Sequence, residues 1–175
     1  VYDNKYGVVT SQTGPNGLTT SWTFDSFGNP LGEQRADGTG STVERRWIEN
    51  CNHTAPNAAY CVITTTDGGA PAEVYFDALN REVRKVTLGF DGRPVYTDTV
   101  YNHKGQVEKV SRAYFVGSPT IYWANSYYDD MGRVIRAEQP GTEGQVKTTE
   151  TEYNGLTTVS INSKGQRKTT ITNAL

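Results

Sequence analysis

The stretch Tyr128-Asp129-Asp130-Met131-Gly132-Arg133-Val134 decides how this sequence folds. Asp129 follows an aromatic residue and suits the first position of a type I turn, because its side chain can accept hydrogen bonds from backbone N–H groups ahead of it. Three residues later, Gly132 allows the left-handed conformation that a G1 bulge requires. Arg133 then begins the returning strand. The stretch therefore predicts a β-hairpin whose first strand ends at the aromatic residue.

The same pattern recurs along the chain, and internal repetition is the strongest signal in the sequence. The further copies are Tyr101-Asn102-His103-Lys104-Gly105-Gln106-Val107, Phe76-Asp77-Ala78-Leu79-Asn80-Arg81, Phe24-Asp25-Ser26-Phe27-Gly28-Asn29, and the looser Tyr2-Asp3-Asn4-Lys5-Tyr6-Gly7-Val8 and Ile161-Asn162-Ser163-Lys164-Gly165-Gln166. Asn80 replaces Gly in one copy, and Asn is the next-best residue for a left-handed position. Aromatic positions 2, 24, 76, 101, 128 and 153 are 22, 52, 25, 27 and 25 residues apart, so we expect a degenerate copy at Trp47.

The composition favours strands over helices. The chain has 24 Thr, 16 Val and 11 Tyr but only 6 Leu and 11 Ala, and 18 Gly and 7 Pro require frequent turns. Apolar and polar residues alternate with a period of two in 18–24, 95–101 and 121–127, as in strands with two different faces. We therefore predict an all-β fold, an antiparallel strip of β-hairpins with about two strands per repeat.

Length and charge limit the possible functions. At 175 residues the chain has the length of one domain, and we interpret 1–175 as a single repeat segment with an inserted loop at 51–61. The chain opens on Val1 rather than Met and ends one position before the next expected glycine, which suggests excision from a longer array. A net charge of -2 argues against nucleic-acid binding by bulk charge and against a polybasic membrane anchor. No apolar run is long enough to span a bilayer.

Cys51 and Cys61 flank a nine-residue loop. A disulfide closing this loop could contribute about 2–3 kcal/mol and would require an oxidising compartment. The alternative is a pair of reduced thiols at strand ends. His53 and Asp67 could complete a zinc site with the two cysteines, but the second ligand doublet typical of such sites is missing. We therefore expect a plain loop, with neither a metal nor a cofactor.

No residues are spaced as a catalytic group, and we expect no enzyme activity. His103 lies inside a turn without a nucleophile or carboxylate placed to work with it. Asp129 and Asp130 are interpreted as turn residues rather than paired acids or calcium ligands. Tyr122 and Trp123 form the best candidate surface for stacking on sugar rings, although aromatic packing across strands explains them as well.

The pattern aromatic-Asp-x-x-Gly-Arg, at a period in the twenties, resembles the YD repeats of the RHS family over nearly the whole chain. Residues 76–144 are most similar to the B component of bacterial insecticidal toxin complexes and to similar RHS proteins. The resemblance implies a sheet that curves or spirals into a hollow shell around a toxic C-terminal payload, in a secreted or cell-surface bacterial protein.

The resemblance also implies partners. These are the rest of the same shell and its payload, and glycans if the chain is instead a carbohydrate- or cell-surface-binding module. The family's autoproteolytic aspartates lie at the C-terminal end of the shell, and no Asp-Pro sequence occurs here, so no catalytic residue is carried over. An isolated repeat segment exposes unpaired strand edges, and we expect it to self-associate.

Overall fold

The computed structural model describes residues 1–142 and 144–173, and they form fifteen strands and one short 3-10 helix. The elements are β1 (Ser11–Thr13), β2 (Thr19–Phe24), β3 (Pro30–Gln34), β4 (Gly40–Trp47), η1 (Ile48–Asn50), β5 (Tyr60–Thr66), β6 (Ala72–Phe76), β7 (Glu82–Leu88), β8 (Pro94–Tyr101), β9 (Val107–Ser111), β10 (Tyr114–Phe115), β11 (Trp123–Tyr128), β12 (Val134–Pro140), β13 (Val146–Asn154), β14 (Thr157–Asn162) and β15 (Arg167–Ile171). The prediction that the chain breaks off within a further copy falls partly on residues 174–175, outside the described residues.

The chain divides into two compact units, residues 1–96 and residues 97–175. The boundary falls inside β8, so both units are parts of the same series of hairpins. That the whole chain is one segment of a longer array stays a prediction.

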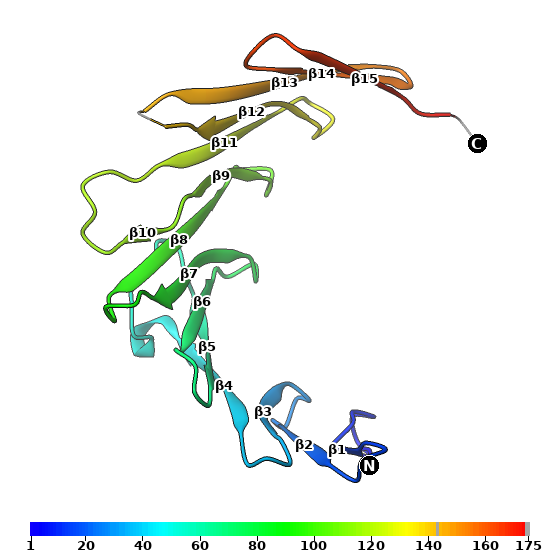
Figure 1. Cartoon of the computed structure of the whole chain (residues 1–175), viewed down its shortest axis with the longest axis vertical. Coiled ribbons are helices and arrows are strands. Elements are labelled where there is room, and N and C mark those ends of the chain that lie inside the picture. Colours follow the sequence, from blue (N-terminus) through cyan, green and yellow to red (C-terminus); the bar gives the residue numbers. More distant parts are fainter. Residues whose placement is uncertain (143, 174–175) are drawn as a thin grey trace. The chain divides into compact units, whose positions relative to one another are not determined.

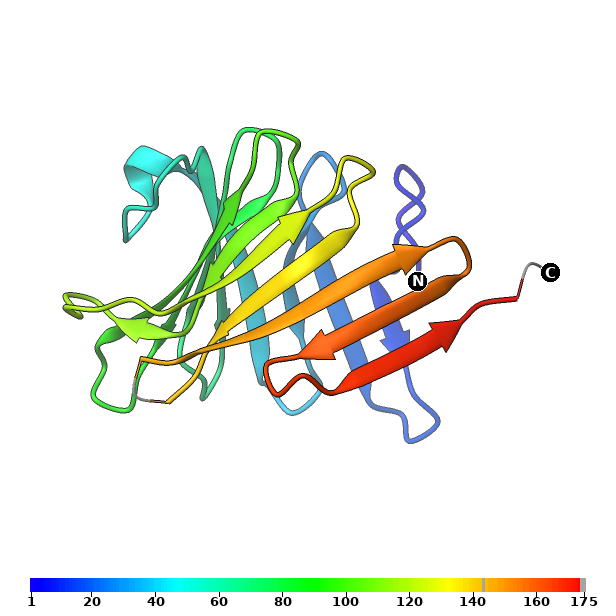
Figure 2. The ribbon, with the colours of Figure 1, turned by 90° about the horizontal axis from the view of Figure 1, so that it is seen from above.

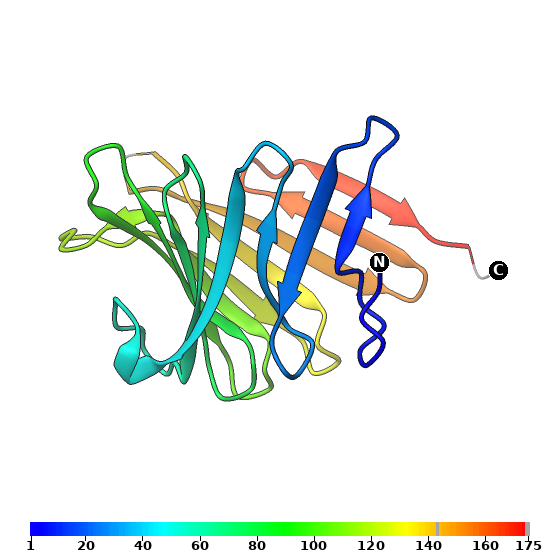
Figure 3. The same ribbon diagram turned by 90° about the horizontal axis from the view of Figure 1, so that it is seen from below.

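In the first unit, β1 to β7 are hydrogen-bonded in the order in which they follow one another, each antiparallel to the next (Figures 1 and 3). The pairing of β4 with β5 runs from Ser41 opposite Thr66 to Trp47 opposite Tyr60. The core lies beside this pair. The buried hydrophobic residues of the described chain are Cys61, Ile63, Tyr75, Val83, Val86 and Tyr96.

In the second unit the strand order from β8 is β9, β11, β12, β13, β14 and β15, and β10 lies off this path and pairs with β8 (Figure 2). The pairings along the path from β8 to β15 are antiparallel. Asp98 and Ser111 are the only buried residues among those described in this unit, and every residue of β15 is exposed. The all-β, antiparallel hairpin fold predicted from the sequence is confirmed.

The turn geometry predicted from the repeat is present in five copies, which begin at Asp25, Asp77, Asn102, Asp129 and Asn162. In the fourth of these the Asp129 N–H donates to the Arg133 carbonyl (2.9 Å), and the Gly132 N–H donates to the Asp129 carbonyl (3.0 Å). The fourth turn residue has a positive φ in every copy, from 62° at Asn80 to 82° at Gly132. The pairing register shifts at the aromatic residue before the first four turns, which is the expected bulge.

Three positions differ from the simple repeat. In the first copy one extra residue precedes Gly7, whose N–H donates to the Asp3 carbonyl. Trp47 ends β4, but it leads into η1 and the cysteine loop rather than into a turn of this kind. After Tyr153 the chain reverses through Gly155 (φ 57°), and the repeat turn comes one hairpin later.

Turns outside the aromatic copies use the same backbone hydrogen bonds. The Arg35 N–H donates to the Thr39 carbonyl, and the Gly38 N–H donates to the Arg35 carbonyl. Gly38 has a φ of +83°, and a Cβ added there would meet nothing within 4 Å. The backbone conformation is therefore the constraint that requires glycine at this position.

We predict that Gly38→Ala lowers the free energy of unfolding by about 1 kcal/mol, because alanine is strained in the left-handed region. Gly38→Asn should cost less, since Asn tolerates this conformation. Urea denaturation followed by tryptophan fluorescence measures both variants. Equal losses for Ala and Asn would mean that backbone strain does not control this turn.

Candidate functional site: the repeat turns and the cysteine loop

The first and fifth residues of each repeat turn pair through their side chains. Asp77 accepts a hydrogen bond from Nε of Arg81 (2.8 Å), and Asn102 donates from Nδ2 to Oε1 of Gln106 (2.9 Å). The other copies pair Asp25 with Asn29, Asp129 with Arg133, and Asn162 with Gln166. An Arg therefore occurs opposite a carboxylate, and a Gln occurs opposite an amide.

The first residue also holds the backbone of its turn. Oδ1 of Asp77 accepts the N–H groups of Leu79 and Arg81, both at 2.9 Å. Asp77 is only 6% exposed. Its burial raises the pKa, but the hydrogen bonds from Arg81 and Leu79 and the charge of Arg81 outweigh burial and hold the pKa of Asp77 below its usual 3.8. At Asp129, the backbone N–H of Arg133 is the main group that lowers the pKa.

Aromatic residues of the repeat connect successive copies in the second unit. The Tyr128 hydroxyl donates to the Val107 carbonyl (2.7 Å), and the Tyr153 hydroxyl donates to the Val134 carbonyl (3.1 Å). The Arg133 guanidinium lies 4.3 Å from the centre of the Tyr153 ring. Each tyrosine thus reaches back to the returning strand of the copy before it. The sequence predicted only that the aromatic closes a strand, although Tyr rather than Phe at these positions was a signal for a hydroxyl partner.

The aromatic residues of the first unit behave differently. The Phe76 ring stacks on Tyr60, with the ring centroids 5.1 Å apart. Tyr2 is 68% exposed, and an isolated bridge joins it to Val9. Phe76 and Tyr2 each precede a turn of the repeat, but they do not make the hydroxyl contact with a preceding copy that Tyr128 and Tyr153 make.

Cys51 and Cys61 form a disulfide, with an S–S distance of 2.07 Å and a Cα–Cα distance of 6.2 Å. Cys51 follows η1, and Cys61 lies in β5 and is fully buried. Because the two sulfur atoms are bonded to each other, the zinc arrangement with His53 and Asp67 does not form. Within residues 1–142 and 144–173, no three His, Cys, Asp or Glu side chains are grouped to hold a metal ion.

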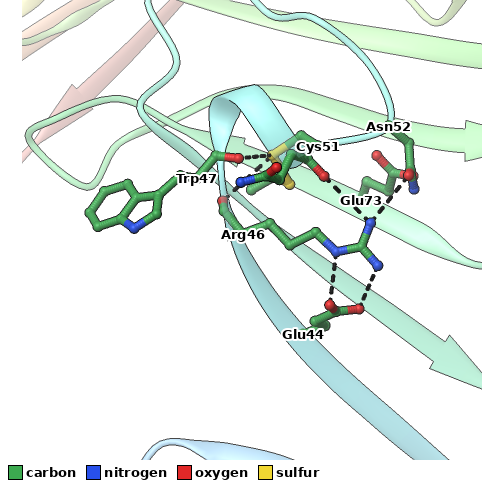
Figure 4. Close-up of polar contacts among 8 residues, drawn as sticks. Glu44, Arg46, Trp47, Cys51, Asn52 and Glu73 are labelled. Atoms are coloured by element: carbon green, nitrogen blue, oxygen red, sulfur yellow. Dashed lines mark hydrogen bonds and ion pairs between the residues drawn. A yellow bond between two sulfur atoms is a disulfide. The ribbon is translucent and has the colours of Figure 1, made fainter.

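Residues 51–59, which we call the strap, begin beside Arg46 (Figure 4). The Arg46 guanidinium binds both carboxylate oxygens of Glu44 (2.8 and 2.7 Å) and donates to Oδ1 of Asn52 (3.3 Å). Nδ2 of Asn52 donates to Oε1 of Glu73 (2.6 Å), which connects the start of the strap to β6. The Trp47 side chain points away from this group and is 67% exposed (Figure 4).

The strap then passes over β6. The backbone N–H of His53 donates to the Tyr75 hydroxyl (2.8 Å), which in turn donates to Oε2 of Glu73 (2.6 Å). Tyr75 is fully buried and Glu73 is 5% exposed. Burial, followed by the hydrogen bond to Glu73, raises the pKa of Tyr75 well above its usual value. The tyrosine is therefore a neutral donor that links the strap to a buried carboxylate.

Contacts to β7 and β8 complete the attachment. Nη1 of Arg84 donates to the Thr54 carbonyl (2.5 Å), and the Arg84 guanidinium lies 4.3 Å from the centre of the Tyr96 ring. The Tyr96 hydroxyl is 3.1 Å from Nδ1 of His53, and Nε2 of His53 is 4.0 Å from Oε1 of Glu73. We call Glu73, Tyr75, Arg84 and Tyr96 the strap cluster. Each of its polar side chains contacts the strap, so the cluster attaches this loop to the sheet.

A second polar and aromatic surface lies on β11 and β12. Trp123 begins β11, with Nζ of Lys109 4.8 Å from the centre of its ring, and Tyr122 precedes the strand and is 47% exposed. Oε2 of Glu138 accepts hydrogen bonds from Asn125 (3.2 Å) and the Tyr127 hydroxyl (3.0 Å). The bond to Glu138 is the main cause of the raised pKa of Tyr127. The sequence indicated Tyr122 and Trp123 but gave no sign of Glu138, because the contacts of Glu138 with Asn125 and Tyr127 depend on strand pairing.

The remaining candidate residues from the sequence, His103 and Asp130, lie in repeat turns. His103 is exposed in the turn that begins at Asn102, and Asp130 is exposed beside Asp129. In the part of the chain that the structure describes, no helix is long and apolar enough to cross a membrane.

Successive hairpins with one recurring turn define a β-repeat protein. Residues 2–39 match the family model of the RHS repeat and include the copies at Asp3 and Asp25. This segment is therefore similar to the RHS repeat, which is also called the YD repeat. The copies from Phe76 onward continue the same turn beyond the matched residues.

Two further comparisons add little. No curated protein matches the chain. One similar solved structure is titled "Crystal Structure of TcdB2-TccC3-Cdc42"; the match has 11% identity and a TM-score of 0.29, and covers 97% of this chain. The chain spans 12% of the length of that one.

We predict that stability falls in acid, because the pKa values of Asp25, Asp37, Asp77, Asp91 and Asp129 are all held below 3.8 in the folded chain. As the pH falls, the unfolded chain takes up protons first, so the stabilisation is complete above about pH 5 and is lost as the pH drops through the folded pKa values.

Asp77→Asn tests the contribution of one turn. It should lower the free energy of unfolding by about 2 kcal/mol at pH 7, where it removes the carboxylate partner of Arg81, and the difference from the wild type should shrink as the pH falls through the folded pKa of Asp77. Urea titrations across this range measure the difference, with exposed Asp130→Asn as the matched control. A loss that is independent of pH would contradict the role assigned to the carboxylate.

Proposed function

We propose that this chain is a non-catalytic structural segment of a larger RHS-repeat protein, and that it forms part of the wall of a β-shell. The shell would enclose or deliver a toxic C-terminal payload, in a bacterial protein that is secreted or exposed at the cell surface. The partners of the segment are then the rest of its own shell and the payload.

One observation carries this proposal: each repeat turn adds another hairpin to a sheet in which strands follow their sequence order. The turns at Asp77, Asn102 and Asp129 have the same backbone hydrogen bonds, so further copies would extend the sheet in the same way. A sheet that grows by repetition suits a wall. The edge strand β15 is paired on one side by β14, and a further strand could add to its other side.

The polar groups of the described residues support a structural role. The turn carboxylates are bound to backbone N–H groups and to Arg or Asn, and the strap cluster holds a loop. A catalytic site requires an acid, base or nucleophile that is oriented toward a substrate. In the turns and the strap, the same groups are used to hold the backbone.

We predict that the C-terminal region of the full-length protein carrying this segment resists trypsin as long as the repeat wall is folded. Asp77→Ala combined with Asp129→Ala should weaken two turns of the wall and speed cleavage of that region at least about tenfold, since each turn loses charge-assisted hydrogen bonds. Asp130→Ala is the matched control, and trypsin should cleave its C-terminal region at the wild-type rate. Equal cleavage of the C-terminal region inside and outside the full-length protein would overturn the shell proposal.

A carbohydrate- or cell-surface-binding module is the second candidate, and the surface of Trp123, Tyr127, Asn125 and Glu138 favours it. Aromatic faces stack on sugar rings, while an amide and a carboxylate can bind hydroxyl groups. Here Asn125 and Tyr127 are both hydrogen-bonded to Glu138, which fixes these groups on the face of β11 and β12.

For this second function we predict saturable quenching of tryptophan fluorescence in a titration with soluble glycans, and its loss in Trp123→Ala. Tyr122→Ala should weaken binding, because Tyr122 is the more exposed of the two. Trp47→Ala, at an exposed indole far away in sequence, is the control. Binding that survives Trp123→Ala would remove this surface from consideration.

A further inference from the structure

The strap lies where the other hairpins have short turns. Between β4 and β5 the chain makes η1 and the strap, whereas β6 and β7 are joined by the five-residue repeat turn that begins at Asp77. The disulfide ties the start of the strap to β5. Near the end of the strap, the Ala59 N–H donates to the Phe76 carbonyl (2.7 Å) and its carbonyl accepts from Ile48 N–H (3.0 Å).

The strap is held over the sheet by polar contacts. They are the bonds from Asn52 to Glu73, from His53 to Tyr75, from Arg84 to Thr54, and between Tyr96 and His53. Each hydrogen bond contributes little net stability, because the same groups bind water when the loop is open. Ordering nine residues has a large cost in conformational entropy. The Cys51–Cys61 disulfide offsets part of this cost, because it fixes the start of the strap to β5.

We infer that the Cys51–Cys61 disulfide is a redox-sensitive latch, whose reduction opens the strap and uncovers the strap cluster while the sheet stays folded. This inference does not rest on the shell proposal. It assigns to the first unit two states: a closed one in an oxidising compartment, and an open one with Glu73, Tyr75 and Arg84 exposed to solvent in a reducing compartment.

The reductant is a low-molecular-weight thiol such as glutathione. Its thiolate attacks Sγ of Cys51, which is only half-buried, whereas Cys61 is fully buried. A mixed disulfide forms, and Cys61 leaves as a thiolate that takes a proton. A second thiol attacks the mixed disulfide and releases Cys51, so the two cysteines are reduced to thiols while two reductant thiols are oxidised to one disulfide.

Amide hydrogen exchange of the whole chain, with and without reduced glutathione, tests the latch. The amides of His53 and Ala59 should exchange about 10- to 100-fold faster after reduction, as expected when a short-loop disulfide is removed. The Asp129 amide, which donates to the Arg133 carbonyl in the second unit, is the internal control and should not change. The double variant Cys51→Ser/Cys61→Ala should reproduce the reduced pattern without glutathione.

Two outcomes would overturn the inference. Unchanged protection at His53 and Ala59 would mean that polar contacts alone keep the strap closed. Faster exchange at Asp129 by the same factor would mean that the disulfide stabilises the whole chain and does not control the strap.

Discussion

The fold depends on one local interaction, an Asp or Asn side chain that accepts backbone N–H groups at the start of a turn. At Asp77 the acceptor oxygen takes two N–H groups, and the other oxygen binds Arg81. This arrangement fixes where a strand ends and in which register the next one returns. In a chain that is 35% hydrophobic and buries few side chains completely, hydrophobic contacts alone specify strand register weakly. The repeat turns therefore specify the strand register, which hydrophobic contacts in the core specify only weakly.

The hairpins could be predicted from the sequence because the information for them is local. An aromatic residue, an Asp and a Gly within five positions define both the hydrogen bonds and the left-handed residue. Asn80 shows that the local pattern also covers a substitution. It replaces Gly in its copy, and its φ of 62° is left-handed, as the sequence predicted. Trp47 and Tyr153 show the limit: spacing alone placed copies there, but neither is followed by a left-handed residue three positions after an Asp or Asn.

The strap could not be predicted, because its contacts connect residues far apart in the sequence. Glu73, Arg84 and Tyr96 become neighbours only after three strands have paired in register. The cysteine spacing indicated a loop and left open whether it was bridged. In a strand, a charged residue with alternating neighbours predicts a solvated face, yet Glu73 and Arg84 are both buried under the strap. Because the strap covers this face of the sheet, charged residues that alternation predicts to be exposed are buried. The sequence has no periodic pattern that indicates such a covering loop.

The two units connect neighbouring hairpins by different contacts. In the second unit, Tyr128 and Tyr153 each bind a carbonyl of the preceding copy, so neighbouring hairpins are connected by a bond that repeats with the motif. In the first unit Phe76 has no hydroxyl, and the buried hydrophobic side chains gather instead on β5 to β8, beside the strap. There, an inserted loop with a disulfide contacts three neighbouring strands, β6, β7 and β8. Because the tyrosine contact is part of the repeat and the strap is not, the repeat tolerates an insertion at a hairpin end without losing its sheet.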